Sequence, residues 1–300
     1  KKLFVLLLAL TVLAGAVFAQ ATVNGYIRSV GTYDVDADTF SIANRLRLNL
    51  GWTSEDKNVM FAARIQNDGS TFAVPNYMYG KIKLADGKVA ISGGKLWNFD
   101  YDISTSLSEY YIGNVNNGGW FLGTVGMLVQ VMPIEALSLG LIITPDGGPL
   151  GANQFGVNAK FDIEGVGSVI VASKFDDPFD TSFVSAAFKF TMVEGLSAAV
   201  GYKGLASDQI FAVVDYATGP VTLQVAPLLN LTADTFYIEG AVKYAASDAL
   251  AFLASFSYQD DVFFALETLY TVGKGLLQLN LVYNGATEAF QISPVVKVSF

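Results

Sequence analysis

The arginines have the most distinctive chemistry in this chain, because there are only four and all lie in its first quarter. Three lysines continue the series, and the basic set is Arg28, Arg45, Arg47, Arg64, Lys81, Lys83 and Lys95. Guanidinium and ammonium groups bind carboxylates, phosphates and other anions. Their spacing over successive short segments predicts a basic wall on one face of those segments.

A polar stretch, residues 98–119 (NFDYDISTSLSEYYIGNVNNGG), begins directly after this basic set and carries the acids Asp100, Asp102 and Glu109. The alternation of apolar and polar residues seen elsewhere stops inside it. A connection of this length without regular structure is usually functional or disordered. We expect it to fold into the mouth of the structure built by its neighbours, to narrow that mouth, and to bring its acids opposite the basic wall.

Two opposed rows of charge across a narrow opening would set up a transverse field that orders water and selects ions. A simpler interpretation places residues 98–119 outside and treats the basic residues as an ordinary water-facing lining. The aromatic residues of the stretch could also stack on sugars, although packing of the stretch against a wall is the plainer role for them.

Most enzyme chemistry is excluded by composition. The chain has no histidine and no cysteine, so a Ser-His-Asp triad, most zinc sites and a disulfide framework are all ruled out. The segment 34–38 (DVDAD) has the spacing of the first calcium ligands of an EF-hand loop, but the glycine and the later glutamate are missing. We therefore expect no enzymatic activity, no metal and no cofactor.

The chain opens with two lysines, an apolar run and small residues ending at Ala19, which predicts a secretory signal peptide over residues 1–19. Residues 20–300 would then form one domain. Without Lys1 and Lys2 the 18 basic residues become 16, against 27 acidic ones, a net charge of −11 that argues against a nucleic-acid partner.

The remaining sequence is strongly apolar but has no long apolar run. Apolar residues make up 52% of the chain and charged residues only 15%. After residue 19 no segment approaches the ~20 apolar residues of a membrane-spanning helix. High apolarity without such runs is typical of a transmembrane β-barrel, in which lipid-facing and water-facing residues alternate.

Alternation with a period of two runs through the chain. In residues 40–52, Ile42, Leu46 and Leu48 fall on one face, while Arg45 and Arg47 fall on the other. Eight tight turns alternate with nine mostly longer loops, which predicts an all-β, antiparallel up-and-down barrel of about 18 strands, or 16 if two marginal strands merge. An even number places both chain ends beside the tight turns.

The last strand carries Phe290, Ile292, Val296, Val298 and Phe300 on one face, and Phe300 ends the chain. With the leader and the alternating strands, this pattern resembles bacterial outer-membrane porins of the general diffusion class. The resemblance implies that the barrel-assembly machinery reads the final strand through Val296, Val298 and Phe300. It also implies that an early loop folds into the lumen against basic wall residues.

We therefore expect a trimeric channel in the bacterial outer membrane, in contact with its lipids, for passive diffusion of small hydrophilic solutes and ions. A weak preference for anions follows from the basic wall. Three alternatives remain open from the sequence: a channel selective for sugars or amino acids, a structural or adhesive barrel without an open lumen, and a soluble two-sheet sandwich.

Overall fold

The structure is a computed structural model that describes residues 21–68, 77–96, 124–144, 154–176, 180–204 and 208–300. The predicted leader, residues 1–19, and the stretch 98–119 with Asp100, Asp102 and Glu109 lie outside these residues. The described strands are β1 (Thr22–Asp34), β2 (Thr39–Thr53), β3 (Val59–Asp68), β4 (Tyr77–Leu84), β5 (Val89–Leu96), β6 (Thr124–Ile134), β7 (Leu137–Thr144), β8 (Gln154–Ile163), β9 (Gly167–Asp176), β10 (Asp180–Phe190), β11 (Leu196–Gly204), β12 (Gln209–Thr218), β13 (Val221–Asn230), β14 (Thr235–Ala245), β15 (Leu250–Tyr258), β16 (Val262–Val272), β17 (Gly275–Asn284) and β18 (Ala289–Ser299).

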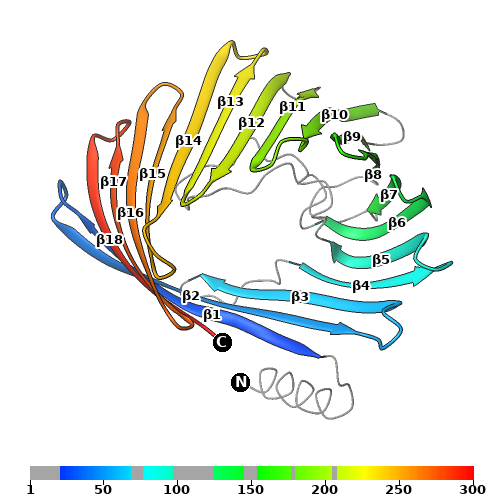
Figure 1. Ribbon diagram of the computed structural model, residues 1–300, viewed down its shortest axis with the longest axis horizontal. Coiled ribbons are helices and arrows are strands. Elements are labelled where there is room, and N and C mark those ends of the chain that lie inside the picture. Colours follow the sequence, from blue (N-terminus) through cyan, green and yellow to red (C-terminus); the bar gives the residue numbers. More distant parts are fainter. Residues whose placement is uncertain (1–20, 69–76, 97–123, 145–153, 177–179, 205–207) are drawn as a thin grey trace.

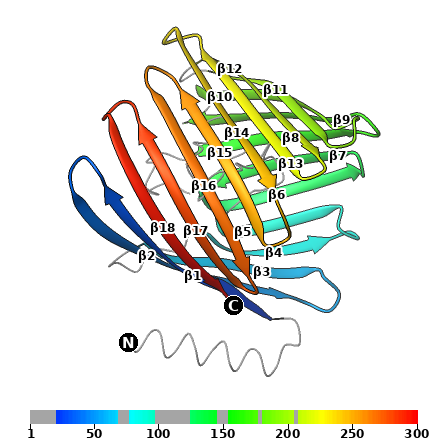
Figure 2. The same cartoon turned by 60° about the vertical axis from the view of Figure 1, so that its left-hand side comes forward.

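These 18 strands form one closed antiparallel barrel. Each strand pairs with the next in sequence, and β1 also pairs with β18 (Figures 1 and 2). The closing ladder ends where the amide of Gly25 donates to the carbonyl of Phe300 and the amide of Phe300 donates to the carbonyl of Gly25, at 3.3 and 3.1 Å. The prediction of an all-β up-and-down barrel is confirmed, with 18 strands rather than 16.

The two faces of the barrel differ as the alternation predicts. Residues directly opposite each other in neighbouring strands share a face, so the register fixes which side chains point outward. Outward positions are exposed and apolar almost throughout, and the last strand is typical: Val296, Val298 and Phe300 are 50%, 52% and 45% exposed. An apolar outer surface on a closed sheet suits contact with hydrocarbon, where backbone groups find no water.

Tyrosines mark both ends of the outer surface. Tyr202, Tyr258 and Tyr283 are exposed near the strand ends that lead into the longer loops, while Tyr216 and Tyr244 are exposed near the tight turns. Amphipathic rings in two such belts are typical of the two membrane–water interfaces of a barrel.

Glycine shapes most of the tight turns. Five of the eight contain a glycine with positive φ, a conformation that costs an L side chain energy, and these are Gly87, Gly165, Gly195, Gly219 and Gly273. The eight tight connections lie at the same end as Thr22 and Phe300, as an even strand number requires. The three longest connections, residues 69–76, 97–123 and 145–153, join strands at the other end, where the sequence predicts the longer loops.

Three prolines inside strands coincide with interruptions of the ladder. The β1–β18 register passes from the Val30–Val295 pair to Tyr33–Ile292, beside Pro294. The β12–β13 register skips two positions beside Pro227, and β6–β7 shifts register beside Pro133. Proline has no N–H to donate, so each interruption reflects a missing ladder hydrogen bond.

Strands are the only regular secondary structure among the described residues. Within the described ranges, no helix is long and apolar enough to cross a bilayer.

The outward faces should tolerate charge far less than the inward faces. We expect Val225→Arg, in the middle of β13 on the outer face, to destabilise the barrel by about 2–4 kcal/mol, because an arginine would meet hydrocarbon. Thr222→Arg, on the inner face of the same strand, is the matched control and should cost much less. Urea titration of the refolded protein in lipid, read by heat-modifiable gel migration, measures both. Equal losses would contradict the assignment of the two faces.

Candidate functional site

A set of basic side chains lines the inner face where β18, β1, β2, β3 and β4 lie side by side. Arg28 on β1 stands directly opposite Arg45 on β2, and Arg47 stands opposite Tyr26. Arg64 on β3 stands opposite Asn49. Lys81 and Lys83 lie on the inward face of β4, which alternates with the outward Met78, Ile82 and Leu84. We call Arg28, Arg45, Arg47, Arg64, Lys81 and Lys83 the basic wall.

Neutral polar and aromatic side chains position this wall. The Nε of Arg47 donates to Oε1 of Gln66 at 2.7 Å, and its guanidinium lies 5.0 Å from the ring centre of Tyr26. The Nε of Arg64 donates to Oδ1 of Asn49 at 2.9 Å, and its guanidinium lies 5.1 Å from the ring centre of Tyr77. These contacts hold the two guanidinium groups in place through neutral side chains.

Lys81 is held in the same way, because its Nζ donates to Oε1 of Gln130 on β6 at 3.3 Å. Gln130 is itself buried. The basic wall therefore extends its contacts as far as the sixth strand.

Sequence reasoning missed one member of this region. Lys297 on β18 stands directly opposite Arg28, because β18 closes the barrel against β1. Its Nζ lies 4.5 Å from the ring centre of Tyr26. The signal was present in the alternation of the last strand, where Lys297 falls on the face opposite Val296 and Val298, but only closure shows which strand it meets.

The structure corrects the prediction for Lys95. Lys95 pairs with Met78 on β4 and with Val125 on β6, both of which are exposed on the outer face. Its neighbour Leu96 is the buried, inward residue instead. Lys95 therefore does not belong to the basic wall, and its place near the loop end of β5 allows its long side chain to reach the polar interface.

The acids predicted to face the wall, Asp100, Asp102 and Glu109, lie outside the described residues. Carboxylates missed by sequence reasoning stand on the inner face of other strands. Asp215 accepts a hydrogen bond from Nε2 of Gln224 at 2.5 Å, and Glu239 accepts one from the hydroxyl of Tyr237 at 2.5 Å. Both come from β12–β14, which lie across the barrel from β1–β3 (Figure 1).

A third inward carboxylate lies closer to the closing strands. Glu267 on β16 accepts a hydrogen bond from Nε2 of Gln278 at 2.8 Å, and Gln278 also donates to Asn280 at 2.7 Å. Like the arginines, these carboxylates are held by neutral groups.

The described inward side chains are basic on balance, although the chain is acidic. Among strand residues whose side chains are described, the register turns inward more cations than carboxylates. The cations are Arg28, Arg45, Arg47, Arg64, Lys81, Lys83, Lys160, Lys189, Lys203, Lys243 and Lys297, and the carboxylates are Asp34, Asp162, Asp215, Glu239 and Glu267. Of these, Lys160 and Asp162 pair at 3.1 Å.

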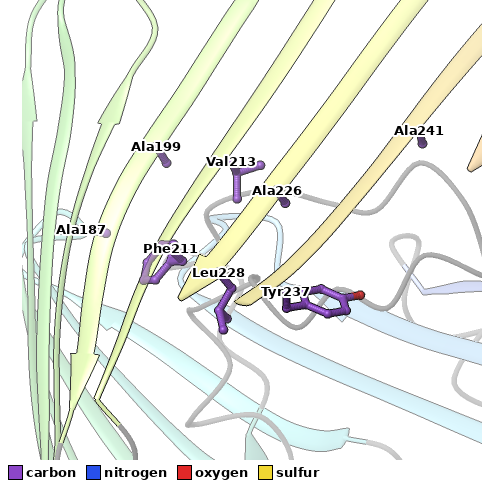
Figure 3. Close-up of a cluster of buried hydrophobic side chains, with 8 residues drawn as sticks. All are labelled: Ala187, Ala199, Phe211, Val213, Ala226, Leu228, Tyr237 and Ala241. Atoms are coloured by element: carbon purple, nitrogen blue, oxygen red, sulfur yellow. The ribbon is translucent and has the colours of Figure 1, made fainter. Parts of the chain in front are cut away.

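Part of the inner face is apolar, which the alternation alone did not predict. A buried cluster on β10–β14 is built around Phe211, Leu228 and Tyr237, with smaller residues beside them (Figure 3). Leu96, Leu128 and Ile142 form a second cluster on β5–β7, against which Tyr79 packs. Other inward positions are small, including Gly51 and Ala62.

Metal chemistry finds no support in the part of the chain that is described, because its His, Cys, Asp and Glu residues form no group of three or more that could hold an ion.

Comparison with known proteins supports the fold. No protein-family model and no curated protein matches the chain. An engineered variant of the porin of Rhodopseudomonas blastica superposes with a TM-score of 0.56 at 17% identity, over 93% of this chain and all of that one. A structure described under asymmetric conductivity of engineered proteins gives 0.56 at 19% identity, over 94% and 100%. This chain therefore has a porin-like fold.

Removing charge from the basic wall should weaken any preference of the barrel for anions. We expect the double variant Arg47→Gln with Arg64→Gln to shift the reversal potential in a salt gradient toward cation preference, because two inward charges are lost. Lys160→Gln is the control, since Lys160 already pairs with Asp162. A double variant that behaves like Lys160→Gln would contradict a selective role for the wall.

Proposed function

We propose that this protein is a porin of the bacterial outer membrane, forming a water-filled channel for passive diffusion of small hydrophilic solutes and ions. One observation carries the proposal: an 18-stranded sheet closes on itself with apolar side chains outside and charged side chains inside. Only a structure that meets lipid on its outer face and water on its inner face satisfies both sets of side chains. The porin-like fold points to a channel rather than to an enzyme.

The remaining parts of the proposal follow from the sequence and from its resemblance to porins. Residues 1–19 direct export and are removed, and residues 20–300 form the barrel domain. The assembly machinery reads the final strand through Val296, Val298 and Phe300, whose outward, exposed side chains support such recognition. Three copies associate in the membrane, surrounded by outer-membrane lipids.

Solutes would be sieved by size and biased by charge at a constriction. The proposed constriction consists of residues 98–119 folded inward, with Asp100, Asp102 and Glu109 opposite the basic wall. The hydrogen bonds of Arg47 with Gln66 and of Arg64 with Asn49 support a wall whose cations are fixed in position. A lining with more cations than carboxylates favours anions over cations.

A channel selective for sugars is the second candidate, because tyrosines stand among the basic residues. Tyr77 and Tyr79 lie next to each other on the inward face of β4, with ring centres 6.0 Å apart. Such rings offer apolar faces on which a sugar can pack, with hydrogen-bonding side chains beside them.

Purified mature protein should raise the conductance of a planar bilayer in discrete steps. We expect liposomes that contain it to swell in isotonic sugar solutions at rates that fall with solute size and rise in proportion to concentration, because passive sieving has no saturable site. Saturation with one class of sugar would favour the selective channel instead. Absence of any conductance from correctly folded protein would overturn both candidates.

Replacing residues 98–119 with a short Gly-Ser linker should raise the single-channel conductance, because the proposed constriction would be removed. The matched control replaces residues 145–153, a connection at the same end of the barrel, with a linker of the same kind. Unchanged conductance in the first variant, with heat-modifiable migration showing an intact barrel, would count against a constriction by this stretch.

A further inference from the structure

Lys95 differs from every other charged strand residue whose side chain is described, because it faces outward. The register turns the other described strand cations and the described strand carboxylates inward. Lys95 stands opposite Met78 on β4 and Val125 on β6, both exposed on the outer face. No carboxylate of the described strands therefore shares this face with the lysine, and an anionic partner has to come from outside the chain.

The depth of Lys95 in the wall suits contact with lipid headgroups. It is followed on β5 only by Leu96, so it lies at the strand end away from the tight turns. The exposed tyrosines Tyr202, Tyr258 and Tyr283 mark the same end of the barrel. The penalty for an outward charge falls steeply from the middle of the bilayer to its interfaces, where a lysine side chain can extend to lipid phosphates.

An open hollow lies on the outer face next to Lys95. Gly93, two residues before Lys95 on β5, stands directly opposite Gly80 on β4, and both glycines are exposed. A Cβ added at Gly93 would have no atom within 4 Å, and one added at Gly80 would meet the carbonyl oxygen of Met60 at 3.9 Å. We call the open space over the backbone of Gly80 and Gly93 the glycine hollow.

The rim of the glycine hollow is apolar and adaptable. Phe61 on β3 stands opposite one of its glycines, and Met127 on β6 stands opposite the other. Met78 borders it on the side of Lys95, and all three rim side chains are exposed. Methionine is flexible and polarizable, so it can adjust to the irregular outline of a bound chain. An apolar depression thus lies directly beside the one described outward cation.

We propose that Lys95 and the glycine hollow form a binding site for one anionic phospholipid, in which Nζ of Lys95 binds the phosphate and an acyl chain of the same molecule lies over Gly93 and Gly80. This inference rests on the membrane location in the proposed function and specifies a lipid partner of the barrel. Charge complementarity selects the occupant. A second copy of the chain would bring no outward carboxylate from its described strands, whereas the phospholipid brings both an anion and a hydrocarbon chain.

The role of the charge is tested by native mass spectrometry of the folded barrel, with phosphatidylglycerol or phosphatidylcholine of equal acyl chains added. We expect the wild type to retain phosphatidylglycerol more strongly. Lys95→Gln should lower the ratio of the two affinities about five-fold, the factor that corresponds to ~1 kcal/mol for one lysine near an anionic surface. Lys243→Gln is the matched control, because it removes the same charge from the inner face of β14. Equal ratios in the two variants would overturn the site.

The role of the hollow is tested by filling it. Gly93→Leu should lower the retention of both lipids, because its side chain would take the space of the acyl chain, and the φ of Gly93 is not positive, so its backbone accepts a leucine. Ala254→Leu adds a similar bulk at a small outward position on β15 and should retain the wild-type behaviour. Heat-modifiable migration verifies that both variants are folded. Equal retention in Gly93→Leu and Ala254→Leu would contradict the proposed site.

Two further outcomes are distinguishable from these. Dissociation of an oligomer by Gly93→Leu, with lipid retention unchanged, would assign the hollow to a second copy of the chain and overturn the lipid site. Absence of conductance from folded wild-type protein would overturn the proposed channel, while the lipid retention of the same sample would still decide the lipid site.

Discussion

Pairing of every backbone amide and carbonyl is the constraint on which this structure depends. In hydrocarbon an unpaired peptide group costs several kcal/mol, so a sheet with free edges cannot cross a membrane. The ladder between β1 and β18 removes both edges, and it ends in the reciprocal hydrogen bonds of Gly25 and Phe300. Closure also decides which side chains of the first and last strands meet inside the barrel. No local sequence signal specifies this pairing.

Closure and electrostatics are therefore linked. The chain carries a formal net charge of −9, yet its described inward strand positions hold more cations than carboxylates. Acidic residues gather instead in turns and loops, for example at Asp56 and Asp260. Inside, both signs are held by amides and tyrosines, as in the contacts of Arg64 with Asn49 and of Glu267 with Gln278. Charges that are fixed in position orient the field inside a low-dielectric wall.

The fold could be predicted from the sequence because its signal is local. A period of two assigns each residue to a face, and turn residues count the strands, so the barrel followed from pattern alone. The same reasoning failed at Lys95. The small residues Ser92, Gly93 and Gly94 come directly before it, so the alternation of apolar and polar residues does not show which face of β5 points inward. Its charge suggested water, whereas the pairing with Met78 and Val125 sets it outward.

Contacts between distant strands lay beyond sequence reasoning. Lys297 and Tyr26 are separated by nearly the whole chain, and the apolar cluster around Phe211 and Leu228 sits on a face that alternation marks only as inward. Such neighbours depend on stagger between strands, which single-sequence patterns do not carry.

Pro294, which lies in the ladder between β1 and β18, has a mechanical consequence. Pro294 offers no amide proton, and a Cβ added at Gly31 would lie 3.1 Å from the Phe40 ring and 3.3 Å from Cγ of Pro294. At this level two residue pairs are missing from the ladder that joins β1 to β18, only a few residues from Arg28. A barrel under lateral tension separates where neighbouring strands share few hydrogen bonds. This line, like the interruptions beside Pro227 and Pro133, is therefore a place where neighbouring strands separate readily and where backbone amides exchange early with solvent deuterium.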